Sequence, residues 1–202
     1  RALQGDMDLA REILHRLRDA SSDQAPLLFM IEAEILTDAG RRDDAMHVYD
    51  QAVEAFPDNH DLLYSRALLA ASLQRVDLLE QDLRAIIDAD PEHADALNAL
   101  GYTLADRTDE YREAEKLIRK ALKYEPDSPA IIDSLGWVLH KRGKHEEALG
   151  YLEQAYAGFP DPEVAAHIVE VLVALDRREE ALERLVAAEE RDPESELVQD
   201  VR

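Results

Sequence analysis

The sequence predicts an all-α protein built as a right-handed superhelix of stacked helix–turn–helix repeats, in other words a helical solenoid. Three observations lead to this fold class: a period near 34 residues, apolar residues at helical spacing within each period, and a composition that disfavours strands. Glycine (7) and proline (8) are scarce among the 202 residues, and 34% of the residues are charged. Since no apolar–polar alternation of Val, Ile and Thr is present, nothing indicates a strand.

Five prolines mark the period, because each follows a helix-like run. They are separated by 34, 35, 34 and 33 residues. An alanine stands twelve residues before four of them and keeps the same step. A period near 34 with two helices in each unit is typical of a helix–turn–helix array. The prolines are Pro57, Pro91, Pro126, Pro160 and Pro193, and the alanines are Ala45, Ala114, Ala148 and Ala181.

This register divides the chain, 1–202, into one solenoid domain of about five full repeats and a partial one. The run before Pro26 matches the second half of a repeat, and the last residues would cap the array or begin another helix. The expected repeats are 1–25 (partial), 26–59, 60–93, 94–128, 129–161 and 162–195, followed by 196–202.

Within each repeat, apolar residues recur at steps of three and four, which places them on one face of a helix. In the first helix of 129–161 they include Leu135 and Leu139, and in the second helix Leu152. Gly101 and Gly136 stand in the middle of first helices, where glycine costs about 1 kcal/mol relative to alanine. We therefore expect another helix to approach closely at these two glycines.

The ends of the helices are indicated by their residues. Gly40 and Gly143 lie between the two helices of a repeat, where a positive φ is often needed. Ser128-Pro129 and Asp161-Pro162 each combine a capping residue with a proline for the first turn, so each predicts a helix start.

The charge excludes several classes of partner. With 45 acidic and 23 basic residues the formal net charge is −22, which argues against nucleic acid and against an anionic membrane surface.

Cysteine is absent, so disulfides and thiol chemistry are excluded. No apolar run reaches the ~20 residues of a membrane span, and no signal peptide is visible, so the sequence predicts no direct membrane insertion. Because the chain begins at Arg1 within a helical pattern, we expect it to be part of a longer protein.

No catalytic or metal motif is present, and we predict neither an enzyme nor a cofactor. The seven histidines include no HExxH pair, and they are interpreted as surface residues. His140 and His145 stand five apart across a turn and would not share a helical face. The acidic runs are interpreted as solvated faces, since paired carboxylates act as acid and base only in a cleft that shifts their pKa values.

Once the core positions are assigned, the remaining side chains of the first helices should line a concave surface. Aromatic and apolar residues there alternate with acidic ones, which would suit a peptide or helix carrying apolar residues and Lys or Arg. The alternative, equally weighted, is that Tyr102 and Trp137 pack against the neighbouring repeat and support the stack. The predicted partner-binding residues are Met30, Glu34, Tyr64, Leu68, Asn98, Tyr102, Asp133, Trp137 and Lys141.

The chain resembles the tetratricopeptide repeat (TPR) family over nearly its whole length. The resemblance is strongest in ALNALGYTLADRTDEYREAEKLIRKALKYEP and IIDSLGWVLHKRGKHEEALGYLEQAYAGFP, where Leu-Gly, two alanines and a proline recur at fixed offsets. Residues 94–195 are similar to the C-terminal repeats of proteobacterial TPR lipoproteins. That narrower resemblance implies a lipid anchor on the periplasmic side of the outer membrane, and one class of these lipoproteins recruits a carboxy-terminal processing protease and delivers its substrates.

The leading hypothesis is therefore a non-enzymatic adaptor that binds a protein or peptide partner, among them a periplasmic protease and its substrates. The alternative is a self-assembling module, a homo-oligomer within a larger cell-envelope or cytoplasmic complex.

Overall fold

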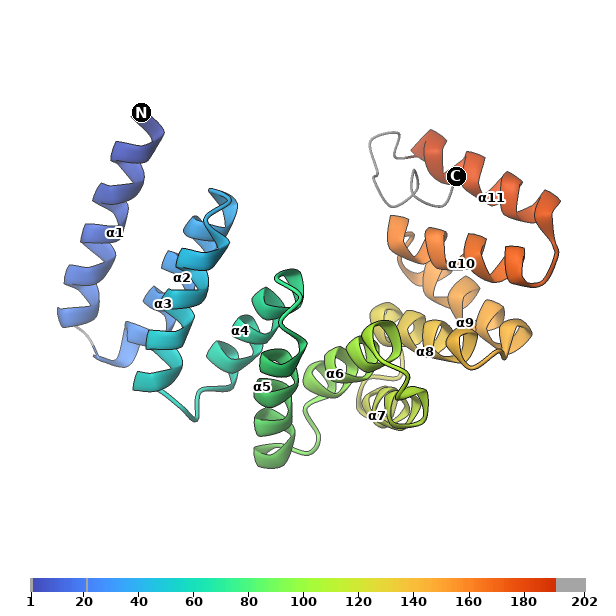
Figure 1. Ribbon diagram of the computed structural model, residues 1–202, viewed down its shortest axis with the longest axis horizontal. Coiled ribbons are helices and arrows are strands. Elements are labelled where there is room, and N and C mark those ends of the chain that lie inside the picture. The colour runs from blue at the N-terminus through green and yellow to red at the C-terminus, as the bar shows by residue number, and fades with distance from the viewer. Residues whose placement is uncertain (1, 21, 192–202) are drawn as a thin grey trace. The chain divides into compact units, whose positions relative to one another are not determined.

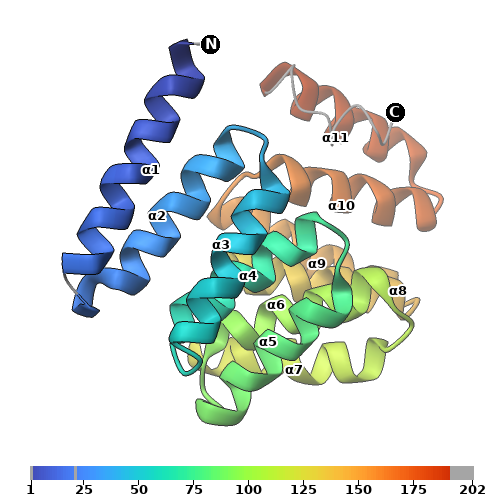
Figure 2. The same cartoon turned by 60° about the vertical axis from the view of Figure 1, so that its left-hand side comes forward.

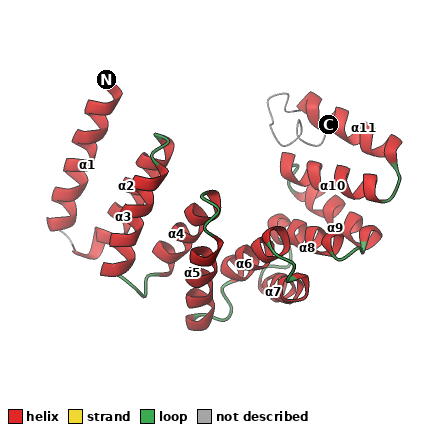
Figure 3. Cartoon of the chain, in the orientation of Figure 1, coloured by secondary structure: helices red, strands yellow, loops and turns green. Residues whose placement is uncertain are grey.

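The structure, a computed structural model, describes residues 2–20 and 22–191. These residues form eleven α-helices and no strand (Figures 1 and 3), so the predicted all-α class is confirmed. The chain divides into two compact units, Arg1–Pro91 and Glu92–Arg202.

The first unit is built from five α-helices. Helix α2 contacts α1, α3 and α4, while α4 also packs on α5. Figures 1 and 2 both show α1 lying beside α2. The helices are α1 (Ala2–Ala20), α2 (Ala25–Asp38), α3 (Arg42–Ala55), α4 (His60–Ser72) and α5 (Val76–Ala89), with a short 3-10 helix, η1 (Ser22–Gln24), before α2.

The second unit repeats the arrangement with six α-helices. Here α8 contacts α6 and α7 on one side and α9 and α10 on the other, and α10 also packs on α9 and α11. The first helices of successive repeats therefore contact one another. The helices are α6 (Ala94–Arg107), α7 (Tyr111–Tyr124), α8 (Pro129–Lys141), α9 (His145–Gly158), α10 (Pro162–Ala174) and α11 (Arg178–Arg191).

Helices α2 to α11 fall in pairs, one pair for each full repeat of the sequence register. Helix α8 begins at Pro129 and α10 at Pro162, as the cap-proline pairs predict. Asp161 caps α10, since its carboxylate accepts the backbone N–H of Glu163 at 2.8 Å, whereas Ser128 makes no such bond. The predicted segment 196–202 and the end of 162–195 lie outside the described residues.

The close approach predicted at the two helical glycines is present. A Cβ at Gly101 would lie 2.6 Å from Ile118 Cγ1, and one at Gly136 would lie 2.6 Å from Leu152 Cγ. Ile118 and Leu152 are fully buried, so neither can move aside freely. The glycines thus let the backbone of α6 lie directly against a side chain of α7, and the backbone of α8 against a side chain of α9.

Four of the five turns between paired helices contain a residue with left-handed backbone, and the turn between α6 and α7 does not. Gly40 and Gly143 have φ of 73° and 76° there. In two repeats without the glycine, Gln74 and Asp176 take the same place with φ of 57° and 59°. Left-handed backbone costs a non-glycine residue roughly 1–2 kcal/mol, so the packing of the helix pairs outweighs the local preference.

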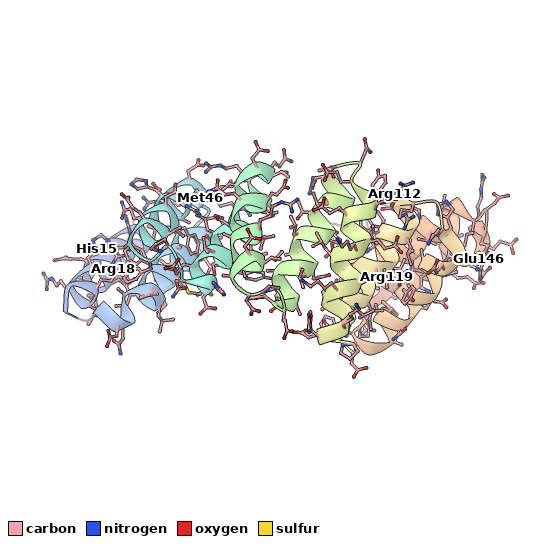
Figure 4. All side chains as sticks on the ribbon, turned by 90° about the horizontal axis from the view of Figure 1, so that it is seen from below. His15, Arg18, Met46, Arg112, Arg119 and Glu146 are labelled. Carbon is pink, nitrogen blue, oxygen red and sulfur yellow. The ribbon has the colours of Figure 1, made fainter. Side chains whose placement is uncertain are left out.

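Two buried acidic residues tie the first unit together. Glu32 of α2, fully buried, lies 2.8 Å from Arg11 Nε, 3.0 Å from His15 Nε2 and 2.7 Å from Arg18 Nη1. His15 and Arg18, labelled in Figure 4, both belong to α1, so this carboxylate fastens α1 to α2. Asp82 of α5 is equally enclosed, and Arg66 of α4 donates to both its oxygens at 2.8 and 2.7 Å.

Among the described residues, no helix combines the length and the apolar character needed to cross a lipid bilayer.

Candidate partner-binding site

A groove of about 450 Å³ opens in the first unit between α2, α3 and α4. Three of the predicted binding residues, Met30, Glu34 and Leu68, line it together. Leu68 is the clearest apolar contact point, since 47% of its surface is exposed. The remaining lining residues are Thr37, Asp38, Arg42, Tyr49, Ser65, Leu69 and Ser72.

The groove combines an apolar floor with a charged edge. Met30, Leu68 and Leu69 supply apolar surface, and Glu34 and Asp38, both exposed, follow one another along one face of α2. Tyr49 closes the floor from α3, and burial raises the pKa of its hydroxyl. One cation, Arg42, also reaches the groove.

Tyr64 does not line this groove. It is half-buried on α4, one residue before Ser65 and four before Leu68. The first unit thus brings three of its four predicted binding residues together and leaves the fourth apart.

In the second unit, Trp137 is buried, with 4% of its surface exposed. Its ring stacks on His167 of α10 with centroids 4.2 Å apart, and on His140 at 5.4 Å. Lys141 Nζ lies 4.3 Å from the ring centroid, in a cation–π position. The expectation that Trp137 is open to a partner is therefore corrected: α10 of the next repeat covers it, which is the supporting role left as the alternative. Its contact with a partner stays a prediction.

Asp133 is buried as well, because it pairs with the same histidine. His167 Nδ1 lies 3.0 Å from Asp133 Oδ1, and the two residues stand one repeat apart on α8 and α10. Burial alone would lower the pKa of His167. The hydrogen bond and charge of Asp133, with Glu163 and Glu170 nearby, outweigh burial and raise the pKa of His167 above its ordinary value.

His140 and His145 lie on different helices, α8 and α9, and so share no helical face, as expected, but both are half-buried rather than exposed. Their Nδ1 atoms are 3.1 Å apart, since the turn at Gly143 folds α9 back along α8. Burial and the neighbouring His145, Lys141 and His167 lower the pKa of His140 to about 4. His140 is therefore neutral at pH 7.

The last two predicted residues lie on α6. Tyr102 is half-buried and donates its hydroxyl to Glu163 Oε1 at 2.6 Å. Burial, together with this carboxylate, raises the pKa of Tyr102. Asn98 is also half-buried. Tyr102 thus joins α6 to α10 across α8 and leaves only part of its ring for a partner.

The described residues hold no group of three or more metal-binding side chains. Of the buried ionisable groups described in this unit, Asp133 and His167 are paired with each other, and Glu115 is paired with Arg119 and Arg142.

The sequence did not predict several residues of the groove in the first unit or of the surroundings of Trp137 in the second. Arg42 and Tyr49 reach the groove from α3, a second helix, whereas only first helices were expected to line it. His167 was interpreted as a surface residue. Its spacing of 34 from Asp133 matches the repeat period and was the available signal, because first helices of adjacent repeats place equivalent residues face to face.

Two models of the tetratricopeptide repeat match the chain, one over residues 32–78 and 103–162 and the other over 139–202. Together they cover more than half of it. A TPR repeat-containing protein of Pseudomonas aeruginosa is 44% identical over 82% of this chain. The chain spans 28% of that relative's length.

Solved structures share the fold. A TPR protein of Thermus thermophilus superposes with a TM-score of 0.76 at 20% identity, over 87% of this chain and 95% of that one. YrrB, described as a TPR protein with an unusual peptide-binding site, superposes with a TM-score of 0.61 at 17% identity, over 93% and 96% of the two chains. Both likenesses concern the fold alone. From its repeat models, its relative and its helix pairs, the chain belongs to the tetratricopeptide repeat family.

Proposed function

We propose that this chain is a non-catalytic docking module that binds a protein or peptide segment in the groove of its first unit. TPR proteins act as protein-interaction scaffolds. The observation that carries the proposal is the groove itself, where the exposed Leu68 and the half-buried Met30 lie beside Glu34 and Asp38. The peptide-binding site reported for YrrB is a further support, since that protein has the same fold.

The chemistry of the groove specifies the ligand class. An apolar side chain of the ligand would cover Leu68 and Met30, which removes their surface from water. A Lys or Arg beside it would meet Glu34 and Asp38 at the edge. The proposed ligand is therefore a segment with an apolar residue flanked by basic ones.

A charge swap tests this specificity. Ten-residue fluorescent peptides with a central leucine, flanked by lysines in one series and glutamates in the other, are titrated by polarisation. The wild type should prefer the lysine series, and Glu34→Lys with Asp38→Lys should reverse the preference. Both residues are exposed, so the fold should persist. If both peptide series bind equally to the wild type and to the variant, the groove is not the surface that selects the ligand.

We further propose that the full-length protein is an adaptor of a carboxy-terminal processing protease. The support is the resemblance of residues 94–195 to proteobacterial TPR lipoproteins and the 44% identity to the Pseudomonas protein, which is longer than this chain. The test is cleavage of a protease substrate with and without the full-length protein. A rate that this protein does not change contradicts the adaptor role.

The same resemblance leads us to propose a periplasmic location at the outer membrane through an N-terminal lipid anchor. Fractionation of cells after labelling with a radioactive fatty acid tests it. The label should follow the protein into the outer-membrane fraction, and an unlabelled protein in the cytoplasmic fraction would contradict the location.

One observation favours the alternative of self-assembly. Leu9, Ile13 and Leu17 form an exposed apolar stripe along α1, at a spacing of four residues. A second copy covering this stripe would make a homo-oligomer. Light scattering between 1 and 100 µM (roughly the range in which weak dimers form) should then show a rising mass, and a constant monomer mass removes this alternative.

A further inference from the structure

The basic residues of this acidic chain are unevenly placed. All five lysines fall between residues 116 and 144, although the whole chain carries a net charge of −22. Helix α7 alone has five basic residues against two acidic ones, Glu113 and Glu115. The basic residues of α7 are Arg112, Lys116, Arg119, Lys120 and Lys123, which we name the α7 basic stripe.

The stripe lies along one side of a single helix. Arg112, Lys116 and Lys120 follow at steps of four, and Lys123 stands three residues further, so their side chains share a face. Eleven residues at 1.5 Å each make the stripe about 16 Å long. Together with Glu115, these residues border a depression of about 490 Å³. Figure 4 shows Arg112 and Arg119 on this helix.

Most of these cations form no ion pair within the described residues. Arg119 is paired, at 2.9 Å from Glu115 and 3.4 Å from Glu147. Among the described residues, no ion pair engages the other four, although acidic residues outnumber basic ones by 45 to 23. Elsewhere the basic residues are mostly paired, as Arg66 with Asp82 and Arg177 with Glu180 show. The stripe therefore holds positive charge that the chain itself does not neutralise.

We propose that the α7 basic stripe is a second docking surface, which binds a short acidic polypeptide segment of a protein partner. The opposite charges of the stripe and the segment supply the attraction. Because salt screens this attraction over a short distance, the length of the partner decides which charges it meets. At physiological salt the Debye length is about 8 Å, so a segment some 16 Å long meets mainly the stripe. An anionic membrane or a nucleic acid extends beyond the stripe and meets the remaining, strongly acidic surface. A second copy of this chain carries the same −22 and is repelled in the same way.

This surface is separate from the groove proposed above, which lies on α2, α3 and α4. The two proposals can therefore fail independently. Leu68→Asp should abolish groove binding and leave binding to the stripe unchanged.

The experiment uses the whole chain and a fluorescein-labelled twelve-residue peptide carrying six glutamates, with a glutamine peptide as its uncharged control. The double variant Lys116→Glu/Lys120→Glu is compared with Arg75→Glu/Arg178→Glu, which changes the net charge equally, from −22, at two exposed positions outside the stripe. Circular dichroism checks the helix content of each variant.

The wild type and the Arg75/Arg178 variant should bind the acidic peptide, and binding should weaken as salt rises from 50 to 300 mM (on the order of the screening range). The Lys116/Lys120 variant should bind about tenfold more weakly, since two attractive pairs become repulsive. Equal affinity of the two variants overturns the proposal. Two other results would also overturn it if the acidic peptide does not bind. One is that the wild type, but not the Lys116/Lys120 variant, sediments with phosphatidylglycerol vesicles. The other is that the wild type, but not this variant, forms dimers.

Discussion

At the scale of single residues, the central observation is that the Trp137 ring is buried between repeats and is not exposed on the surface. Trp137 is enclosed by His167, His140 and Lys141, and its neighbour Asp133 pairs with the same His167. The pattern of the first helix correctly separated Trp137 from the Leu135/Leu139 core face. It could not show how far α10 covers that second face, because the cover comes from the next repeat.

Trp137→Ala should therefore act on stability. Loss of a buried tryptophan lowers the free energy of unfolding by about 3–5 kcal/mol. The control is Phe159→Ala, since 61% of Phe159 is exposed and its removal should change stability by about 0.5 kcal/mol or less. Urea unfolding followed by circular dichroism measures both. If the Trp137→Ala variant is as stable as the wild type, Trp137 does not stabilise the packing of the repeats, and the prediction that it contacts a partner is favoured instead.

The His167–Asp133 pair should make stability depend on pH. The raised pKa of His167 means that its contribution is complete below the ordinary value near 6.5 and is lost as pH rises through the higher folded pKa. Since protonated imidazole quenches indole, the emission of Trp137, the sole tryptophan, should rise over the same range.

His167→Gln should remove this fluorescence step, whereas His47→Gln, on the exposed part of α3, should keep it. The pH dependence of stability that His140 contributes has the opposite sign. Its pKa of about 4 means that its neutral form favours the fold above pH 6.5, and that this contribution is lost as pH falls towards about 4. A step that persists in His167→Gln contradicts the assignment.

At the scale of elements, the sequence predicts the helix pairs well because each signal is local. The prolines, the cap residues and the steps of three and four locate α2 to α11 to within a residue or two of the expected repeats. The turns through Gln74 and Asp176 were not predicted, since Gln rarely takes a positive φ and Asp takes one less readily than Gly. There the packing of two helices, a longer-range effect, decides the backbone.

Gly136→Ala tests the close approach of α8 and α9. The new Cβ would stand 2.6 Å from Leu152 Cγ, so overpacking of about 1–3 kcal/mol exceeds the helix propensity gained. Gly150→Ala, in α9 with open space around it, should instead stabilise by about 0.5–1 kcal/mol. Thermal unfolding compares the two, and equal melting temperatures would contradict the packing described at Gly136.

Glu32→Gln tests the attachment of α1. Loss of the charge leaves Arg11 and Arg18 without their anion and should lower stability by about 2 kcal/mol. Glu12→Gln, which removes an exposed i,i+4 pair with Arg16, should change it by less than about 0.5 kcal/mol. Hydrogen exchange of the α1 amides reports the release. Protection of α1 that is the same in both variants would contradict this role.

The pH dependence of the same site follows from the lowered pKa of Glu32. Burial alone would raise that pKa, but the hydrogen bonds of Arg11 and His15 and the charge of Arg18 outweigh it. The attachment of α1 should be complete above pH 4.5 and should weaken as pH falls through the lower folded pKa.

At the scale of the molecule, the chain offers two surfaces of opposite chemistry, one in each unit. The groove presents apolar side chains beside Glu34 and Asp38, and the α7 basic stripe presents unpaired cations. Three of the four groove-side residues expected from the sequence gather in one place, because repeat geometry fixes the first helices. The contributions of Arg42 and Tyr49, and the burial of Trp137, depend on the neighbouring helix and could not be read from a single repeat.

The most direct test of the docking account compares two leucines. Leu68→Asp places a charge in the groove, and Leu27→Asp places one on the same unit outside it, where 58% of Leu27 is exposed. With the lysine-flanked leucine peptide, isothermal titration should show at least about tenfold weaker binding for Leu68→Asp and wild-type affinity for Leu27→Asp. Equal affinities of the two variants would contradict the claim that partners dock in this groove.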